Sequence, residues 1–240
     1  MSSLSGSIQI VGQDLLTTST NQAMQLGAQA TTNDGRFFRY SLLGAVAAVP
    51  GKLFQASAQV ANHQNLAPTA NGAIGDKTIT VTLGATAATA NQYAGGFAII
   101  TTSTGAGYAY AIASNPAAAL SATLTLTLTD ALLTTTASAS TKVDLIANPY
   151  SGVVVNPATA SSAPIGSAVF AVTAAQYGWM QTSGTASLLA DGAVVVGTAL
   201  VASNATAGAV EALTGVQAPV GTAITDIDTT QYGAVNLLLS

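Results

Sequence analysis

Polar and apolar residues alternate strictly in two segments of the chain. Residues 78–83 and 123–128 each place threonine and an aliphatic residue at successive positions. Because successive side chains of a strand point to opposite faces, each segment would have one apolar and one hydroxyl-bearing face, as in antiparallel sheets. Threonine is β-branched and is itself favourable in strands. We therefore expect both segments to be strands of antiparallel sheets.

Shorter apolar runs separated by turn residues predict further strands along the rest of the chain. Gly105-Ala106-Gly107 joins two of them, 96–101 and 108–113, as a hairpin. The other predicted strands are 36–40, 52–55, 142–147, 152–155, 167–173, 178–182, 193–201, 208–213, 222–226 and 234–239. This spacing is typical of sandwiches and barrels. The predicted fold class is all-β, with an antiparallel sandwich or barrel architecture.

The pattern divides the chain into three regions. Residues 1–32 are polar and weakly patterned, and we expect an extended N-terminal arm that becomes ordered only against a partner, with a short helix at 21–30. A disordered tail is the alternative. Residues 33–160 are predicted to form a sandwich-like β domain, and residues 161–240 a small glycine-rich C-terminal β-barrel.

The C-terminal region contains an internal repeat. Residues 164–182 and 219–237 align without a gap, 55 positions apart, with six of nineteen residues identical. The identical residues include the proline and glycine of Pro164-Ile165-Gly166 and of Pro219-Val220-Gly221, and a shared Gln-Tyr-Gly. We interpret the repeat as two equivalent strand pairs, in which each glycine lets the backbones approach closely.

Ionic groups are scarce along the whole chain. Only 6% of residues are charged, against about 25% in ordinary soluble proteins. A nearly uncharged surface suits a protein that is covered by its neighbours, although a secreted protein with a Thr/Ser-rich surface is an alternative. With five basic residues and a net charge of −4, a nucleic-acid partner is not expected. We expect neither a conventional signal peptide nor a membrane span.

Few residues offer catalytic or metal-binding chemistry. The chain has one histidine, His63, which we interpret as a polar loop residue, and it has no cysteine. Asp226 and Asp228 could share a strand face as a carboxylate pair, but the sequence around them lacks an aromatic sugar groove or a calcium loop, so a loop-end acidic pair is favoured. The prediction is a protein that is not an enzyme, with no catalytic, cofactor-binding or metal-binding residues.

Aromatic and basic residues supply the candidate interface. Trp and Tyr are frequent anchors of protein interfaces, so Tyr177 and Trp179 are candidate contacts, with a plug of the barrel core as the alternative. Arg36 and Arg39 lie three apart on a predicted strand and would face opposite sides, and one of them could pair with a carboxylate of a neighbouring molecule. The candidate interface residues are Arg36, Phe38, Arg39, Tyr40, Tyr177 and Trp179.

Two parts of the chain resemble virion structural proteins of tailed bacteriophages. Residues 34–40, with Gly44 and residues 50–53, are similar to the opening of such proteins. Residues 177–184, together with the later segments at 191–200, 208–210 and 220–224, resemble the small-barrel pattern of capsid decoration, or cement, proteins. The resemblance covers about 33–55 and 164–240, and the middle third contributes only its β character.

The resemblance implies a function and a location. Such a protein would bind the outer surface of the phage head, often as a homotrimer, and clamp neighbouring subunits of the major capsid protein. We then expect the arm and residues 36–40 to contact the shell, so that deletion of residues 1–32 weakens attachment. The alternative function is a receptor- or carbohydrate-binding module of a phage fibre or cell-surface protein, with Tyr177 or Trp179 exposed to the sugar.

Overall fold

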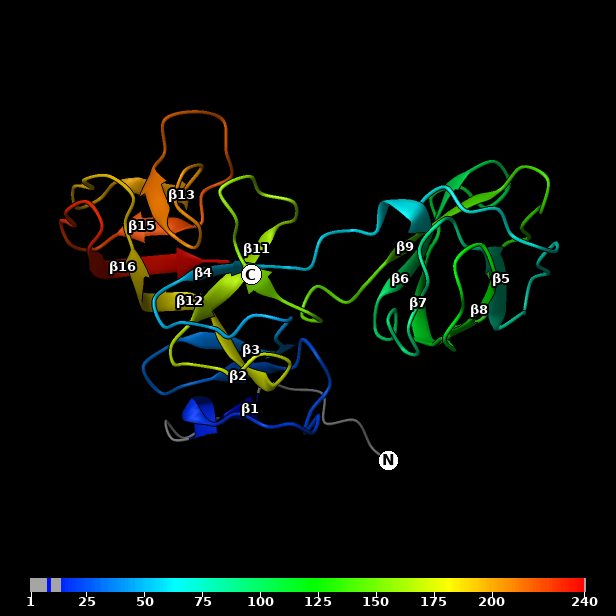
Figure 1. The fold of residues 1–240 in the computed structure, drawn as a ribbon, viewed down its shortest axis with the longest axis horizontal. Coiled ribbons are helices and arrows are strands. Elements are labelled where there is room, and N and C mark those ends of the chain that lie inside the picture. Colours follow the sequence, from blue (N-terminus) through cyan, green and yellow to red (C-terminus); the bar gives the residue numbers. More distant parts are fainter. Residues whose placement is uncertain (1–7, 10–13, 240) are drawn as a thin grey trace. The chain divides into compact units, whose positions relative to one another are not determined.

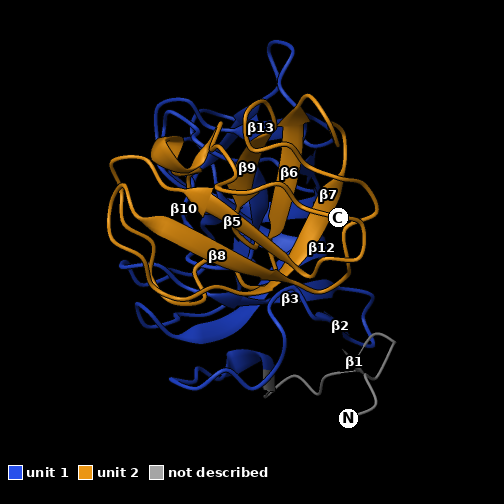
Figure 2. Ribbon diagram, turned by 90° about the vertical axis from the view of Figure 1, so that its right-hand side faces the viewer, with its two compact units in different colours: residues 1–57, 149–240 blue, residues 58–148 orange. Residues whose placement is uncertain are grey.

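The computed structural model describes residues 8–9 and 14–239, and this part of the chain folds mainly into antiparallel β-strands (Figure 1). The chain forms two compact units, which are coloured separately in Figure 2. Unit 1 combines residues 1–57 with 149–240, and unit 2 is residues 58–148. The predicted all-β sandwich or barrel class is confirmed. No helix of the described residues is long and apolar enough to cross a membrane.

Unit 1 is built on one curled sheet. Its eleven strands are β1 (Ile8–Gln9), β2 (Gln29–Thr31), β3 (Phe37–Leu42), β4 (Leu53–Gln55), β10 (Val154–Val155), β11 (Pro164–Ala168), β12 (Tyr177–Leu189), β13 (Ala199–Ala202), β14 (Val210–Ala212), β15 (Gly221–Ala223) and β16 (Tyr232–Leu238). A short 3₁₀ turn, η1 (Asp14–Leu16), precedes β2. The thirteen-residue strand β12 organises the unit, because its first half pairs with β3 and β11 and its second half with β16.

Unit 2 is a small barrel. Its strands are β5 (Thr78–Thr82), β6 (Phe97–Thr102), β7 (Ala109–Ser114), β8 (Thr123–Leu128) and β9 (Lys142–Ile146), in the sheet order β5-β8-β7-β6-β9. The segment after the 3₁₀ turn η2 (Ala61–His63) links the two edge strands, since Leu66 bridges to Val143 of β9 and Pro68 to Val81 of β5. The aliphatic residues of β5 and β8 face the core and their threonines face outward, as the alternation predicts.

Unit 1 contains the same arrangement twice. Copy A is residues 37–57 and 149–182, and copy B is residues 183–238. The predicted repeat is confirmed at the level of strand register, because Ser167 opposes Gln181 in copy A and Thr222 opposes Asn236 in copy B, both 55 positions later. Further pairs match in the same way: Leu42–Tyr177 with Leu189–Tyr232, Phe54–Gly166 with Leu200–Gly221, Gln55–Val154 with Val201–Glu211, and the bridge Ala48–Val172 with Val194–Ile227.

The duplication identifies unit 2 as an insertion. Copy B passes from β13 to β14 through the seven residues 203–209. The equivalent strands of copy A are β4 and β10, and unit 2 lies between them in the chain. Where copy B has a short loop, copy A therefore holds a complete barrel.

The same turn also occurs within unit 2. Leu83 donates to Ala122 O as Leu43 donates to Gln176 O, and Ser121 donates to Gly84 O as Ala175 donates to Gly44 O. The donor residue of the second of these hydrogen bonds has a positive φ in both units, 57° at Ser121 and 56° at Ala175. The turn that follows the first strand of copy A is thus a recurrent element of both units.

Several boundaries differ from the predicted ones. Residues 33–57 and 149–160 belong with the C-terminal region in unit 1, not with 58–148, because β3 pairs with β12, and β4 pairs with β10 and β11. Residues 21–30 contain no helix. Instead, residues 14–32 pack on their own chain, and β2 lies antiparallel to β3. The described part of the predicted arm is therefore ordered by contacts within the chain and not by a partner. The remainder of the arm, 1–7 and 10–13, lies outside the described residues.

Candidate functional site

Three of the predicted interface residues belong to the core of copy A. Phe38, Tyr40 and Trp179 are at most 5% exposed, and they pack with Leu15 and Ala30 from the N-terminal segment. Tyr40 also accepts a hydrogen bond from the backbone N–H of residue 23 at 3.1 Å. These side chains are covered by their own chain, so the prediction that these three residues form an interface is wrong. Trp179 instead occupies a core position, which was the alternative interpretation.

Tyr177 lies at the edge of the same aromatic cluster and is half-buried. Its ring stacks on Tyr40, with ring centres 5.8 Å apart, and Trp179 meets Tyr40 edge-on. Its backbone N–H and C=O both bond to Ser19, at 2.8 and 3.1 Å. Tyr177 therefore anchors the N-terminal segment of its own chain to β12.

The two candidate arginines have partners within the chain. Arg36 precedes β3, and its Nε lies 2.8 Å from Oδ2 of Asp34. The side-chain hydrogen bond from Thr32 is the main cause that lowers the pKa of Asp34, and Arg36 contributes as well. Arg39 donates to the carbonyl of Gly27 at 3.0 Å and lies over the ring of Tyr150. These contacts do not support the expectation that one arginine forms an ion pair with a carboxylate of a neighbouring molecule.

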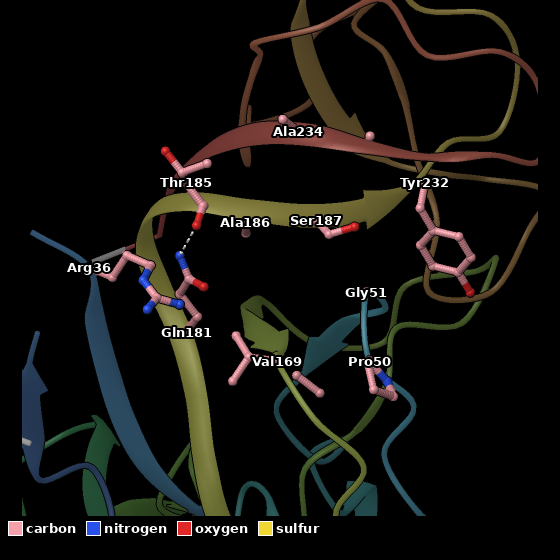
Figure 3. Close-up of a pocket in the computed structure, with 12 residues that line it drawn as sticks. Arg36, Pro50, Gly51, Val169, Gln181, Thr185, Ala186, Ser187, Tyr232 and Ala234 are labelled. Carbon is pink, nitrogen blue, oxygen red and sulfur yellow. Dashed lines mark hydrogen bonds between the residues drawn. The ribbon is translucent and has the colours of Figure 1, made fainter. Parts of the chain in front are cut away.

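A groove of about 750 Å³ lies in unit 1 on the concave side of the bend in β12 (Figure 3). Copy B supplies one wall from β12 and β16, and the β11 end and the turn before β4 of copy A supply the other. The lining residues are Arg36, Pro50, Gly51, Ala168, Val169, Gln181, Thr185, Ala186, Ser187, Tyr232, Gly233 and Ala234. With the exception of Arg36, which is already ion-paired, the lining is uncharged.

Gln181 determines the geometry of this bend. Its Nε2 donates to the carbonyl oxygens of Ser183 and Thr185, at 3.1 and 2.9 Å. Gly184 between them has φ +87°, a conformation that glycine adopts without strain, so β12 bends there and continues. Gln181 is fully buried beside the groove (Figure 3), and its Oε1 has no hydrogen-bond partner in the described chain.

A second exposed feature is an apolar turn at the end of copy B. We call Val195, Val196 and Ile224 the copy-B turn; they are 65%, 57% and 42% exposed. Their backbones are neighbours because Gly197 donates to the carbonyl of Ala223, and the exposed carboxylate of Asp226 lies at the same turn, where it accepts from the N–H of Val196. Exposed aliphatic residues close together in the chain make this turn a candidate contact surface.

The remaining polar candidates have structural positions. His63 is buried in η2, where the ring accepts from the hydroxyl of Tyr93 at Nδ1 and donates from Nε2 to Thr86 O at 2.9 Å. The residue interpreted as a polar loop histidine is therefore a buried, hydrogen-bonded residue of a 3₁₀ turn. Asp226 and Asp228 are exposed in the turn after β15, and Asp226 accepts from the N–H of Val196 at 2.7 Å. In the part of the chain that the structure describes, no three His, Asp or Glu residues form a group that could hold a metal ion.

The groove residues were missed because their sequence is unremarkable. Thr185, Ser187 and Ala234 are small residues in a chain rich in small residues. A signal was nevertheless present in the repeat: 55 positions separate Trp179 from Ala234, so a large side chain in one copy corresponds to a small one in the other. Comparison of this chain with protein-family models, curated proteins and solved structures found no match.

Proposed function

We propose that this chain is a virion structural protein, a capsid decoration protein that binds the outer surface of a phage head and stabilises contacts between major capsid subunits. The observation that carries the proposal is the copy-B turn, three adjacent aliphatic side chains exposed on a chain with 6% charged residues. Such a surface favours contact with another protein over free solution. The resemblance of residues 33–55 and 164–240 to decoration proteins names the partner class.

The exposed part of the copy-B turn is large enough to matter for attachment. Complete burial of a Val or Ile side chain contributes about 1.5–3 kcal/mol, so burial of the exposed half of three such residues contributes about 2–4 kcal/mol. Repetition of one contact over many sites of a shell, or over the subunits of a homotrimer, multiplies its effect through avidity. The contact surface differs from the predicted one, since residues 14–32 and the strand at 36–40 are engaged with their own chain.

The test is co-sedimentation of the purified chain with expanded heads that lack it. We expect saturable binding, and we expect the double variant V195S/V196S to reduce occupancy at a fixed concentration at least about tenfold. Leu133→Ser is the matched control, because it changes an equally exposed aliphatic residue, in unit 2. Absence of binding by the unchanged chain would refute the proposal, and equal loss in both variants would refute the role of the copy-B turn.

The alternative of a carbohydrate-binding module loses its predicted site. It required an exposed aromatic platform at Tyr177 or Trp179, but Trp179 is buried and Tyr177 holds the N-terminal segment. We therefore place the proposal on the decoration function alone.

A further inference from the structure

The two copies of unit 1 present equivalent faces with different side chains. The register of β3, β12 and β16 makes four positions correspond. The correspondence is Phe38 with Thr185, Tyr40 with Ser187, Tyr177 with Tyr232, and Trp179 with Ala234. All four copy-B residues line the groove. The groove is therefore the counterpart of the aromatic face of copy A.

In copy A this face is covered by an extended segment of the same chain. Leu15, Met24 and Leu26 pack on the aromatic side chains. Backbone hydrogen bonds hold the segment in place: Gly27 donates to the carbonyl of Tyr40 at 2.8 Å, and Tyr40 donates to the carbonyl of residue 28 at 3.0 Å. The cover thus combines strand-like backbone pairing with apolar side chains, which is how sheet edges bind extended peptides.

In copy B the described residues contain no counterpart of the segment 15–31, and only the turn at Pro50-Gly51 approaches this face, where Gly51 lies against the ring of Tyr232 and accepts from the N–H of Leu189. Thr185, Ser187 and Ala234 leave a hollow where Phe38, Tyr40 and Trp179 fill the space in copy A (Figure 3). The ring of Tyr232 is 51% exposed, and its N–H and C=O have no counterpart of Ser19 among the described residues.

We propose that the groove binds an extended, uncharged segment of a protein partner that carries a leucine- or methionine-sized side chain. The absence of charge follows from the lining, whose single cation is paired with Asp34. The apolar side chain corresponds to Leu15, Met24 and Leu26 on copy A. The inference goes beyond the proposed function, because it concerns the form of the bound segment and holds whether or not the partner is a capsid subunit.

A peptide with the sequence of residues 15–31 is the probe, since this segment covers the equivalent face. Its own site on copy A is occupied within the full-length chain, so added peptide has the groove as its free site. We expect one peptide to bind per chain in fluorescence anisotropy. A peptide with serine at the positions of Leu15, Met24 and Leu26 should bind at least about tenfold more weakly.

Ala234→Trp restores in copy B the side chain that fills copy A, and it should abolish binding. The matched control is Ala218→Trp, the same change at an exposed loop position of unit 1. Ser187→Tyr is a second groove-filling variant, and circular dichroism verifies that each variant is folded. Failure of the peptide to bind would overturn the inference, as would binding that survives both groove-filling variants. Concentration-dependent dimerisation that Ala234→Trp abolishes would assign the groove to a second copy and overturn the partner segment.

Discussion

The close approach of β15 and β16 makes a sharp prediction for Gly221. A Cβ atom at this position would lie 2.4 Å from the carbonyl oxygen of Asn236 and 3.1 Å from a methyl group of Val235. Ordinary contacts of this kind are longer than 3.4 Å, so Gly221→Ala forces the two backbones apart by roughly 1 Å. Gly221 also pairs with Leu200 on its other side, which leaves β15 no free direction in which to move.

The expected cost follows from the strain and the lost pairing. Overpacking costs about 1–3 kcal/mol, and a weakened ladder hydrogen bond adds about 1 kcal/mol. The reduced entropy of the unfolded alanine chain returns about 0.4–1 kcal/mol. Gly221→Ala should therefore destabilise unit 1 by about 1–3.5 kcal/mol, which corresponds to a fall in Tm of about 2–14 °C for a unit of this size.

Thermal unfolding followed by tryptophan fluorescence measures this loss, because the only tryptophan, Trp179, lies in unit 1. The equivalent Gly166→Ala should cost less, since its Cβ would lie 2.8 Å from the carbonyl oxygen of Gln181. Gly215→Ala is the control, with nothing closer than 3.7 Å, and it should change stability by less than about 0.5 kcal/mol. A Gly221→Ala protein as stable as the Gly215→Ala protein would refute the pairing of β15 with β16 described above.

Three further predictions concern other parts of the chain. Burial raises the pKa of Tyr93 to about 12; because the folded pKa lies above the unfolded value of about 10, the stabilisation is complete below pH 10 and is lost as the pH rises towards 12. Denaturant titrations of unit 2 by tyrosine absorbance should show this loss, and Tyr93→Phe should remove it. Leu15→Ala, at a buried position, should cost unit 1 about 2–3 kcal/mol and shift Trp179 emission to the red, whereas Leu16→Ala, at an exposed one, should do neither. Replacement of residues 58–148 by a five-residue Gly/Ser linker should leave the Trp179 emission of unit 1 unchanged, and loss of its cooperative thermal transition would show that unit 1 depends on the insertion.

The strands with strict alternation could be predicted closely from the sequence. The segment 78–83 became β5 and 123–128 became β8, because a period of two has only one arrangement that buries every aliphatic residue. The repeat also predicted the equivalent strand pairs, since Pro, Gly, Gln and Tyr at a constant spacing are constrained by backbone geometry. Local pattern and local geometry were sufficient in these places.

The division into units could not be predicted, because it depends on pairing between distant segments. The strand pattern of residues 33–57 does not separate them from 58–148, and their pairing with β11 and β12 assigns them to unit 1. The length of β12 was underestimated for a similar reason. Ser183-Gly184 has the composition of a turn, but Gly184 bends the strand while Gln181 holds the carbonyls on either side.

The candidate interface failed where burial depends on a weakly patterned segment. Aromatic residues on a strand suit a core and an interface equally well, and the choice for Tyr40 and Trp179 depends on whether another segment covers them. The covering residues Leu15, Met24 and Leu26 have neither a helical nor a strand period. Their role follows from the three-dimensional pairing of residues 27–31 with β3, which the sequence pattern does not contain.

Divergence of the two copies explains why one unit can be both stable and open to a partner. Copy A combines large aromatic side chains with a covering segment, and this gives unit 1 a closed core around Trp179. Copy B keeps the same backbone register but carries Thr185, Ser187 and Ala234 at the equivalent positions, and its core lies instead on the other side of β12 and β16, around Leu188, Val235 and Leu237. The face of copy B is therefore not needed for its own folding. Because the core of copy B does not use this duplicated face, the side chains on the face can change at little cost in stability. This face is therefore the part of the unit best suited to recognise another protein.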